Sequence, residues 1–406
     1  MNNLRRQRKP TVGDLFCGAG GLSLGAAYAG FNVKWAVDKD LDSTVTFHRN
    51  HPNTICYNMD VSEFIFDNME LPRHSVDVLL AAPPCQGFSF ANTRGNSIDM
   101  GELNILTLNV PEAIVKLRPK VLVFENVKGF YYRGGESDTM LKLFLNSLRD
   151  VGYKYDSRIL MSATYGVPQK RERFILYAVP DDKQLPQWPK ETHFIVEETP
   201  IEYRDLYTLG GIIPTPTVDE AFRGLTATIP NMNYHRSNPG HLKRLRNDRV
   251  SNTVLCSIGS GWNNIHPTEY RYISVREQAR LQTFPDDFIF YGTLRSQYRQ
   301  VGNAVPPLLS KVIMQEYDRS SLSQYIVKTQ NLNVLSAVTS CYENEVKLST
   351  EYEIAGTYGG GSLDWAMLMK SVIGGITEVK KQDVNYDVAQ NSVQLQSVMQ
   401  VEMLID

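Results

Sequence analysis

Short apolar runs alternate with longer segments of helical spacing between about residues 10 and 180. Each run is rich in large apolar residues and is bounded by Gly, Pro or Asp, which is typical of a buried strand. The predicted strands are Thr11–Phe16, Lys34–Asp38, Val76–Ala82, Val121–Val127, Arg158–Ser162 and Phe174–Val179. The predicted helices are Leu22–Gly30, Leu41–Asn50, Thr107–Leu117 and Thr139–Val151. This alternation predicts an α/β fold with a doubly wound, mostly parallel sheet.

The pattern changes after Pro180, and residues 181–265 are rich in Pro, Thr, Asn and Gly without a sustained period. This texture indicates a second, smaller domain or a long loop insert. Helical spacing returns at Val275–Gln282 and again from about Pro307 to Tyr317. The predicted organisation is therefore a main domain over 1–180, an irregular region over 181–265, a return to the main domain over 266–320, and an appendage over 321–406 that is either a small α/β unit or partly disordered.

Composition narrows the class of protein. The chain has 406 residues, 42% of them apolar and 21% charged, as in an ordinary soluble globular protein and unlike a disordered or fibrous one. No apolar run reaches the roughly 18 residues that a membrane span needs, and the basic start lacks the apolar stretch of a secretory signal. Five scattered cysteines suit a reducing compartment, so we expect a cytoplasmic protein without a disulfide framework or a metal site. The net charge of −2 neither suggests nor excludes a polyanionic partner.

The first segment with chemistry is Asp14-Leu-Phe-Cys-Gly-Ala-Gly-Gly, which joins a predicted strand to a predicted helix. Glycines at the carboxyl end of such a strand let the backbone approach a nucleotide-like ligand. Asp38 ends the second strand, where a carboxylate can accept hydrogen bonds from ribose hydroxyls. The G-x-G-G spacing differs from the dinucleotide fingerprint, and an acid at the start of the loop suits a cationic aminoacyl group better than a pyrophosphate. A tight turn alone would explain the glycines but not both acids.

The second segment is Ala82-Pro-Pro-Cys-Gln-Gly-Phe-Ser, directly after another predicted strand. Two prolines stiffen the backbone before Cys85, and a cysteine is partly thiolate near neutral pH and intrinsically nucleophilic. We therefore interpret Cys85 as a reactive residue. The other four cysteines are interpreted as small apolar residues of the interior; they are Cys17, Cys56, Cys256 and Cys341.

Two further segments carry charge near predicted strand ends. Glu125 ends the strand over 121–127 and can act as a general acid or bind a ring nitrogen, although a structural ion pair is the alternative. Arg171 and Arg173 have the period-two spacing of one strand face. Parallel guanidinium groups suit phosphate or carbonyl oxygens, and a solvated charged strand is the alternative.

These four segments, in this order, resemble the S-adenosylmethionine-dependent cytosine-C5 DNA methyltransferases of the bacterial and phage modification type. The segments Ser274–Phe288 and Gln300–Pro307 resemble two later motifs of that family, so the resemblance covers about residues 10 to 317. It implies a class I methyltransferase, Rossmann-like catalytic domain with a smaller target-recognition region over 181–265. The appendage after about residue 320 has no counterpart in the resemblance.

The resemblance also implies roles for individual residues. Phe16 would stack on the adenine of S-adenosylmethionine, Asp38 would bind the ribose, and Asp60 the adenine amino group. The full implied cofactor set is Phe16, Gly18, Ala19, Gly20, Gly21, Asp38, Asp60, Pro83, Asn303 and Val305, and no metal is implied. Cys85 would be the nucleophile, Glu125 would contact the pyrimidine edge, and Arg171 with Arg173 would hold the catalytic loop and the target base. Lys39 stands where many relatives have an aromatic residue.

The implied substrate is double-stranded DNA, with the target cytosine flipped out of the helix. Gln86–Arg94 is the predicted intruding loop, and the basic stretch Arg223–Arg249 is the predicted region of phosphate and base contacts. The predicted DNA-binding residues are Gln86, Ser89, Arg94, Arg236, Lys243, Arg244 and Arg246. We expect a monomer whose functional partner is a cognate restriction endonuclease that acts on the same site.

Three alternatives remain open at this stage. The same chemistry on transfer RNA is one, although the Cys-Phe-Thr segment of that branch is not found in the insert. A catalytically silent DNA-binding relative is another, but Cys85, Glu125 and both arginines are present. A nucleotide-dependent oxidoreductase would not explain Pro-Pro-Cys-Gln. The main reading further predicts that the helix after Pro307 packs against the first strand region, so that Asn303 can reach the cofactor loop.

Overall fold

The computed structural model describes residues 8–66, 73–84, 106–132, 136–236, 244–256, 265–317, 346–354 and 361–369. The chain divides into two compact units, Met1–Ser320 and Ser321–Asp406, which are considered separately. In the second unit the described residues form one antiparallel strand pair, β12 (Val346–Ile354) and β13 (Gly361–Met369). No helix among the described residues is long and apolar enough to cross a membrane.

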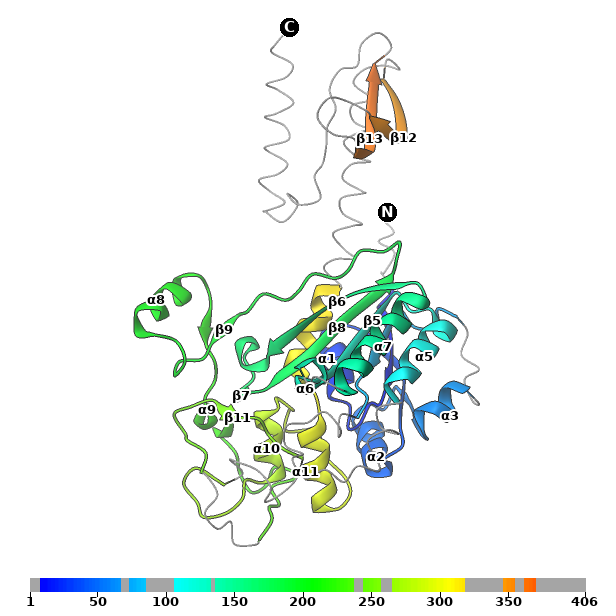
Figure 1. Ribbon diagram of the computed structural model, residues 1–406. Helices are drawn as coiled ribbons and strands as arrows, with labels where there is room; N and C mark the ends of the chain where they lie inside the picture. The colour runs from blue at the N-terminus through cyan, green and yellow to red at the C-terminus, as the bar shows by residue number, and fades with distance from the viewer. Residues whose placement is uncertain are drawn as a thin grey trace, which may run out of the picture. The chain divides into compact units, whose positions relative to one another are not determined.

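The first unit is built on a seven-stranded sheet with the order β3-β2-β1-β4-β5-β8-β6 (Figure 1). Its strands are β1 (Thr11–Leu15), β2 (Asn32–Asp38), β3 (Ile55–Asn58), β4 (Val78–Ala81), β5 (Val121–Val127), β6 (Tyr153–Met161) and β8 (Glu172–Pro180). Neighbours from β3 to β5 are parallel, whereas β8 is antiparallel to both β5 and β6. The predicted doubly wound, mostly parallel α/β sheet is confirmed.

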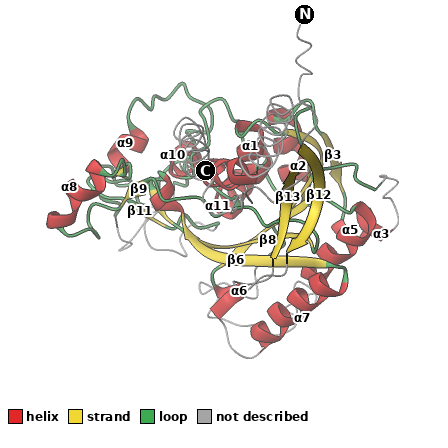
Figure 2. Cartoon of the chain, turned by 90° about the horizontal axis from the view of Figure 1, so that it is seen from above, coloured by secondary structure: helices red, strands yellow, loops and turns green. Residues whose placement is uncertain are grey.

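Alternate side chains of each strand point to opposite faces of the sheet, and each face has its own apolar core. Leu122 and Phe124 of β5 belong to one core, and Val121 and Val123 belong to the other. The first core is covered by α3 (Val61–Phe66), α5 (Asn109–Leu117), α6 (Gly129–Tyr132) and α7 (Glu136–Asp150). The second core is covered by α1 (Gly21–Tyr28), Phe47 of α2 (Leu41–Asn50) and the helix over 307–317. Figure 2 shows α6 and α7 on one side of β6 and β8, with α1 on the other.

Within 181–265, the residues that the structure describes form short elements. They are β9 (His193–Phe194), α8 (Ile201–Leu209), β10 (Ile213–Pro214), α9 (Val218–Phe222) and β11 (Ser251–Asn252). β9 pairs with β10, and β11 pairs with β7 (Gln169–Lys170), so this irregular region is attached to the sheet just before β8. The paucity of regular structure agrees with the turn-rich composition of this part of the chain.

The chain then returns to the sheet through α10 (Val275–Leu281), α11 (Leu294–Asn303) and the helix over 307–317. Ser274 and Glu277 form a capping box at the start of α10, which accounts for the predicted helix boundary. The Ser310 hydroxyl donates to the carbonyl oxygen of Leu22 at 2.7 Å. A Cβ atom on Gly25 would lie 2.3 Å from Ser310 Cβ, so the closing helix packs tightly on α1. Leu309 and Ile313 of this helix share a core with Val12 of β1, in agreement with the predicted packing against the first strand region.

Candidate active site

The loop after β1 has a backbone that few side chains tolerate. Phe16, Gly18 and Gly20 all have positive φ, at 59°, 53° and 97°. The Gly18 N–H donates to Asp38 Oδ2 at 2.9 Å, and the Asp40 N–H donates to Asp38 Oδ1 at the same distance. Both carboxylate oxygens of Asp38 are thus oriented by backbone groups, and burial raises the pKa of this carboxyl. The outer lone pairs of the carboxylate remain available for ligand hydroxyls.

Asp14 lies in β1 directly before this loop and is fully buried. Its Oδ2 accepts a hydrogen bond from the Ser23 hydroxyl at 2.6 Å, whereas Oδ1 has no partner among the described residues. Burial raises the pKa of Asp14 to about 7, an effect that Ser23 opposes and the charge of Asp38 adds to. An unsatisfied buried oxygen is costly, and a cationic ligand group at this end of the sheet would compensate for it.

The segment around Val305, called here the closing segment, packs against the glycine loop. A Cβ atom on Gly21 would lie 2.2 Å from the carbonyl oxygen of Val305, so only glycine allows this approach. Val305 is buried, and Asn303 is exposed at the end of α11. Segments near the two ends of the first unit therefore meet at the glycine loop. This agrees with the prediction that Asn303 can reach the cofactor loop only if these segments lie together.

Phe16 and Asp60 follow the carboxyl ends of β1 and β3, the two strands that flank β2 in the sheet. Asp60 Oδ1 accepts hydrogen bonds from the backbone N–H and the hydroxyl of Ser62, at 2.9 and 2.5 Å. The Lys39 ammonium lies 3.9 Å from Asp60 Oδ2. Despite partial burial, the bonds from Ser62 and the charge of Lys39 lower the pKa of Asp60. Phe16 is partly buried against the core on the α5 side of the sheet.

One functional-site residue had no signal in the sequence motifs. His51 follows α2 and is buried, with its ring stacked on Phe47 at 4.4 Å between centroids. A Cβ atom on Gly20 would lie 2.8 Å from His51 Nε2, so the histidine ring packs directly against the backbone of the glycine loop. Burial lowers the pKa of His51 to about 4, and the ring is neutral at physiological pH.

Glu125 and Arg173 form a nearly buried ion pair at the same edge of the sheet. Arg173 Nε lies 2.8 Å from Glu125 Oε1, and only 12% and 10% of the two side chains are exposed. The antiparallel register pairs Val127 with Arg173 and sets this contact. Burial raises the pKa of Glu125, and the charges of Arg173 and Arg171 oppose that rise. A carboxyl group balanced in this way can hold a proton or hydrogen-bond a ring nitrogen.

Arg173 lies in β8, whereas Arg171 lies outside that strand, so the prediction that one strand contains both residues is wrong. Arg171 lies between β7 and β8, where the chain leaves one short sheet and enters the main one. Its buried guanidinium donates to the carbonyl oxygens of Val254 at 3.1 Å, Gly302 at 2.9 Å and Ala304 at 3.0 Å. Arg171 thus fastens the irregular region and the closing segment to the sheet.

The predicted nucleophile, Cys85, comes four residues after the end of β4 (Val78–Ala81) in the sequence. β4 sits between β1 and β5, with Ala81 paired to Leu15 and to Phe124. The chain continues through Pro83, which is buried, and Pro84. Cys85 is the next residue in the sequence. Cys85, Gln86, Ser89 and Arg94 lie outside the described residues.

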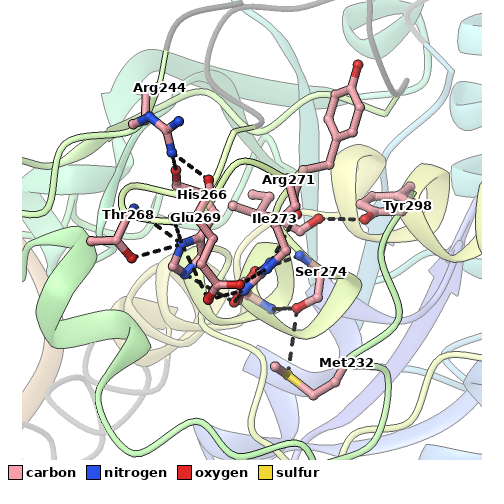
Figure 3. Close-up of polar contacts among 11 residues, drawn as sticks. Met232, Arg244, His266, Thr268, Glu269, Arg271, Ile273, Ser274 and Tyr298 are labelled. Carbon is pink, nitrogen blue, oxygen red and sulfur yellow. Dashed lines mark hydrogen bonds and ion pairs between the residues drawn. The ribbon is translucent and has the colours of Figure 1, made fainter. Parts of the chain in front are cut away.

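The predicted DNA-binding residues of the irregular region differ in their exposure and in their contacts. Arg236 is exposed, and Lys243 lies outside the described residues. Arg244 donates through Nη1 to the carbonyl oxygens of His266 and Glu269 (Figure 3). Arg246 forms an exposed ion pair with Asp248 at 2.8 Å.

Figure 3 also shows a second network that the sequence did not suggest, centred on Arg271. Arg271 donates to both oxygens of Glu277 at 2.8 Å and also pairs with Glu269. Its guanidinium lies 4.9 Å above the ring of Tyr234. The start of α10 is also tied to the irregular region over 181–265, because the Val275 N–H donates to the carbonyl oxygen of Asn233.

Comparison with known proteins agrees with this geometry. The chain is 31% identical over 335 residues to the type II methyltransferase M.PspPI of Psychrobacter, covering 75% of this chain and 78% of the relative. It is 31% identical over 331 residues to M.Eco47II of Escherichia coli, covering 74% and 76%. Among solved structures, a protein described as a prophage-encoded DNA modification methyltransferase of E. coli matches with a TM-score of 0.58 at 24% identity, over 77% of this chain and 99% of the other.

The Dnmt2 methyltransferase of Schizosaccharomyces pombe has the same fold, with a TM-score of 0.55 at 18% identity over 77% of this chain and 99% of the other. The family model described as C-5 cytosine-specific DNA methylase matches residues 11–319. This match spans the glycine loop, the Glu125–Arg173 pair and the closing segment together. The protein therefore belongs to the C-5 cytosine-specific DNA methylase family.

Proposed function

We propose that this protein is a DNA (cytosine-5-)-methyltransferase that modifies a specific duplex site as part of a type II restriction-modification system. The observation that carries the proposal is the buried Glu125–Arg173 pair, which lies at the same sheet edge as the glycine loop and the segment leading to Cys85. The family membership supports cytosine carbon 5 as the methylated atom. The type II relatives support a modification role, in which a cognate endonuclease acts on the same site.

The glycine loop fits S-adenosylmethionine as the cofactor. Asp38 would bind the ribose hydroxyls, and the unsatisfied oxygen of Asp14 suits a cationic aminoacyl end. Phe16, Gly18, Ala19, Gly20, Gly21, Asp60, Pro83, Asn303 and Val305 would complete the pocket. When bound, S-adenosylmethionine supplies an electrophilic methyl group.

The protein side chains would make cytosine reactive toward that methyl group. The Cys85 thiolate forms a bond from Sγ to carbon 6 of the ring, which makes carbon 5 nucleophilic. Glu125 shares a proton with ring nitrogen 3 and offsets the negative charge that develops there, while Arg173 holds the carboxyl in place. After carbon 5 is methylated, a base takes the carbon-5 proton, for which water is a candidate. The Sγ–carbon 6 bond then breaks and the thiolate is released.

The target base must leave the duplex for this reaction, because a thiolate cannot reach carbon 6 of a stacked base. Flipping costs a few kcal/mol. The segment Gln86–Arg94, which contains Ser89, would enter the duplex and offset that cost, together with phosphate and base contacts from the region that contains Arg236 and Lys243. The protein acts as a monomer on one site in this proposal.

The experiment is incubation with tritiated S-adenosylmethionine and either mixed-sequence duplex DNA or transfer RNA. We expect label on cytosine carbon 5 of the DNA, and mapping of the label identifies the site. The Glu125→Gln variant should retain cofactor binding and transfer much less label. The proposal would be contradicted by label on transfer RNA alone. It would also be contradicted by the absence of label on DNA when the folded protein binds S-adenosylmethionine.

A further inference from the structure

A cavity of about 660 Å³ lies between the recognition region and α11. His235 and Cys256 line it from the recognition region, and Arg295 and Arg299 line it from α11. Asp42 at the start of α2 is the one acidic side chain among the described residues that line the cavity. The cavity therefore joins the element that would read DNA to the catalytic part of the protein, and its α11 wall is cationic.

The sequence of α11 produces that cationic wall. Tyr298 and Val301 are buried against α10, so the opposite face of the helix is exposed. Arg295, Arg299 and Asn303 follow one another at intervals of four residues on this exposed face. This row, which we call the α11 row, ends at Asn303, next to the segment that packs on the glycine loop.

Most other arginines near the recognition region are already engaged within the protein. Arg244 binds backbone carbonyls, Arg246 pairs with Asp248, and Arg271 pairs with Glu277. In the α11 row, Arg299 pairs with Asp40 at 2.6 Å and is 49% exposed. Arg295 is exposed and makes no hydrogen bond or ion pair with the residues that the structure describes.

We infer that the α11 row binds the DNA backbone, with Arg295 as the principal phosphate contact and Arg299 as a second one. This inference rests on the proposed function and specifies how its substrate is held. A guanidinium is suited to phosphate because it donates two parallel hydrogen bonds to two oxygens. Asp42 makes no ion pair with Arg295 or Arg299 among the described residues, and its carboxylate lies over the backbone of Gly292, where a Cβ atom would be 2.4 Å from Asp42 Cγ.

The geometry assigns one strand of the duplex to the space between His235 and α11. His235 is exposed on a segment fixed by hydrogen bonds to the start of α10, since the Arg276 N–H donates to Asn231 and the Val275 N–H to Asn233. Base edges would face this fixed segment, and phosphates would face α11. Phosphate contacts of this kind set the position of the duplex and carry no sequence information themselves.

The test is the salt dependence of duplex binding by the full-length protein. Fluorescence anisotropy with a mixed-sequence duplex, in the presence of S-adenosylhomocysteine, gives log Kd against log salt for wild type, Arg295→Gln, Arg295→Lys and Arg299→Gln. Each lost phosphate contact should reduce the slope by about 0.9. We expect that reduction for Arg295→Gln, with weaker binding at low salt, and recovery in Arg295→Lys. Arg158→Gln, an exposed arginine on β6, is the matched control and should keep the wild-type slope.

A wild-type slope for Arg295→Gln would overturn the inference, as would an equal loss in Arg158→Gln. A reduced slope in Arg246→Gln but not in Arg295→Gln would move the contact to the recognition region and contradict it as well. Thermal unfolding and S-adenosylhomocysteine affinity should be unchanged in Arg295→Gln, which separates a phosphate role from a folding defect. If wild-type protein neither binds nor methylates duplex DNA, the proposed function fails, and that outcome is distinct from a failure of the α11 row alone.

Discussion

The guanidinium of Arg171 donates a hydrogen bond to the carbonyl oxygen of Gly302 at 2.9 Å, across 131 positions of the chain. The same guanidinium donates to the carbonyl oxygens of Ala304, two residues after Gly302, and of Val254 in the irregular region over 181–265. One buried side chain therefore holds together the sheet, the irregular region and the closing segment that packs on the glycine loop. Arg171 acts through the backbone groups that it positions.

Replacing Arg171 with Met should destabilise the first unit and weaken cofactor binding together. The substitution removes the Arg171 donor from the carbonyl groups of Val254 and Gly302, whereas the Ala304 carbonyl keeps a hydrogen bond from Gln282 Nε2. Each buried carbonyl left unsatisfied costs about 1–3 kcal/mol. Urea unfolding and calorimetric titration with S-adenosylhomocysteine measure the two effects. Unchanged cofactor affinity in a folded Arg171→Met protein would show that the closing segment does not depend on this arginine.

Removing Arg173 should affect Glu125 more than the fold around it. Arg173→Gln leaves a buried carboxylate without its main counterion, which costs about 3–5 kcal/mol when the charge stays in place. The pKa of Glu125 should rise further, so the carboxyl becomes protonated and part of this cost is avoided. The pH profile of methyl transfer should shift upward on its Glu125 limb, and Arg173→Lys should restore most of the wild-type profile. An unshifted profile would contradict a coupling between the two side chains.

Asp14 should lower the free energy of unfolding as pH rises, the opposite of a carboxyl whose pKa is lowered by folding. Its pKa is raised from 3.8 to about 7 by burial, so between these values the folded state holds a proton that the unfolded state has lost. The Asp14 contribution to the free energy of unfolding therefore falls by about 1.4 kcal/mol per pH unit as pH rises through this window, and it is constant above it. Asp14→Asn lacks this dependence. Unfolding curves of both proteins from pH 5 to 8 test it, and parallel stability profiles would be the contrary result.

The approach of Gly21 to Val305 should tolerate no side chain. Gly21→Ala places a Cβ atom 2.2 Å from the Val305 carbonyl oxygen, so backbone must move. We expect a loss of about 1–3 kcal/mol of stability, the usual range for overpacking, and a large loss of S-adenosylhomocysteine affinity. Gly210→Ala is the matched control, because its nearest contact would be an ordinary 3.4 Å. Equal behaviour of the two variants would contradict a role for this contact.

The sequence predicted the regular parts of the fold because their apolar pattern is local. Val121–Val127 and Leu41–Asn50 have the same bounds in the structure as in the prediction. α11 was not predicted, because Tyr298 and Val301 are its main apolar anchors and its stability comes from packing against α10. β3 was missed for a similar reason, since Ile55 is exposed and the strand has only four residues.

The candidate site was predictable in its residue types and less so in its contacts. The glycine spacing and Asp38 identified the loop. The absence of a hydrogen-bond partner for Asp14 Oδ1 could not be predicted, because it depends on burial by the whole sheet. The partners of Arg171 are backbone carbonyls, which have no signature in a sequence. The Glu125–Arg173 pair likewise depends on the antiparallel register of β5 and β8, which residue spacing alone does not determine.

The central claim is that Cys85 attacks cytosine in DNA, and a duplex that contains 5-fluorocytosine at the mapped site tests it most directly. Fluorine at carbon 5 cannot be removed as a proton, so the Sγ–carbon 6 bond should persist after methyl transfer. The account predicts a stable protein–DNA adduct that requires S-adenosylmethionine, lies on the Cys85 peptide by mass spectrometry, and is absent from Cys85→Ser. A protein that methylates the unmodified duplex but forms no adduct, or forms it at another residue, would contradict the account.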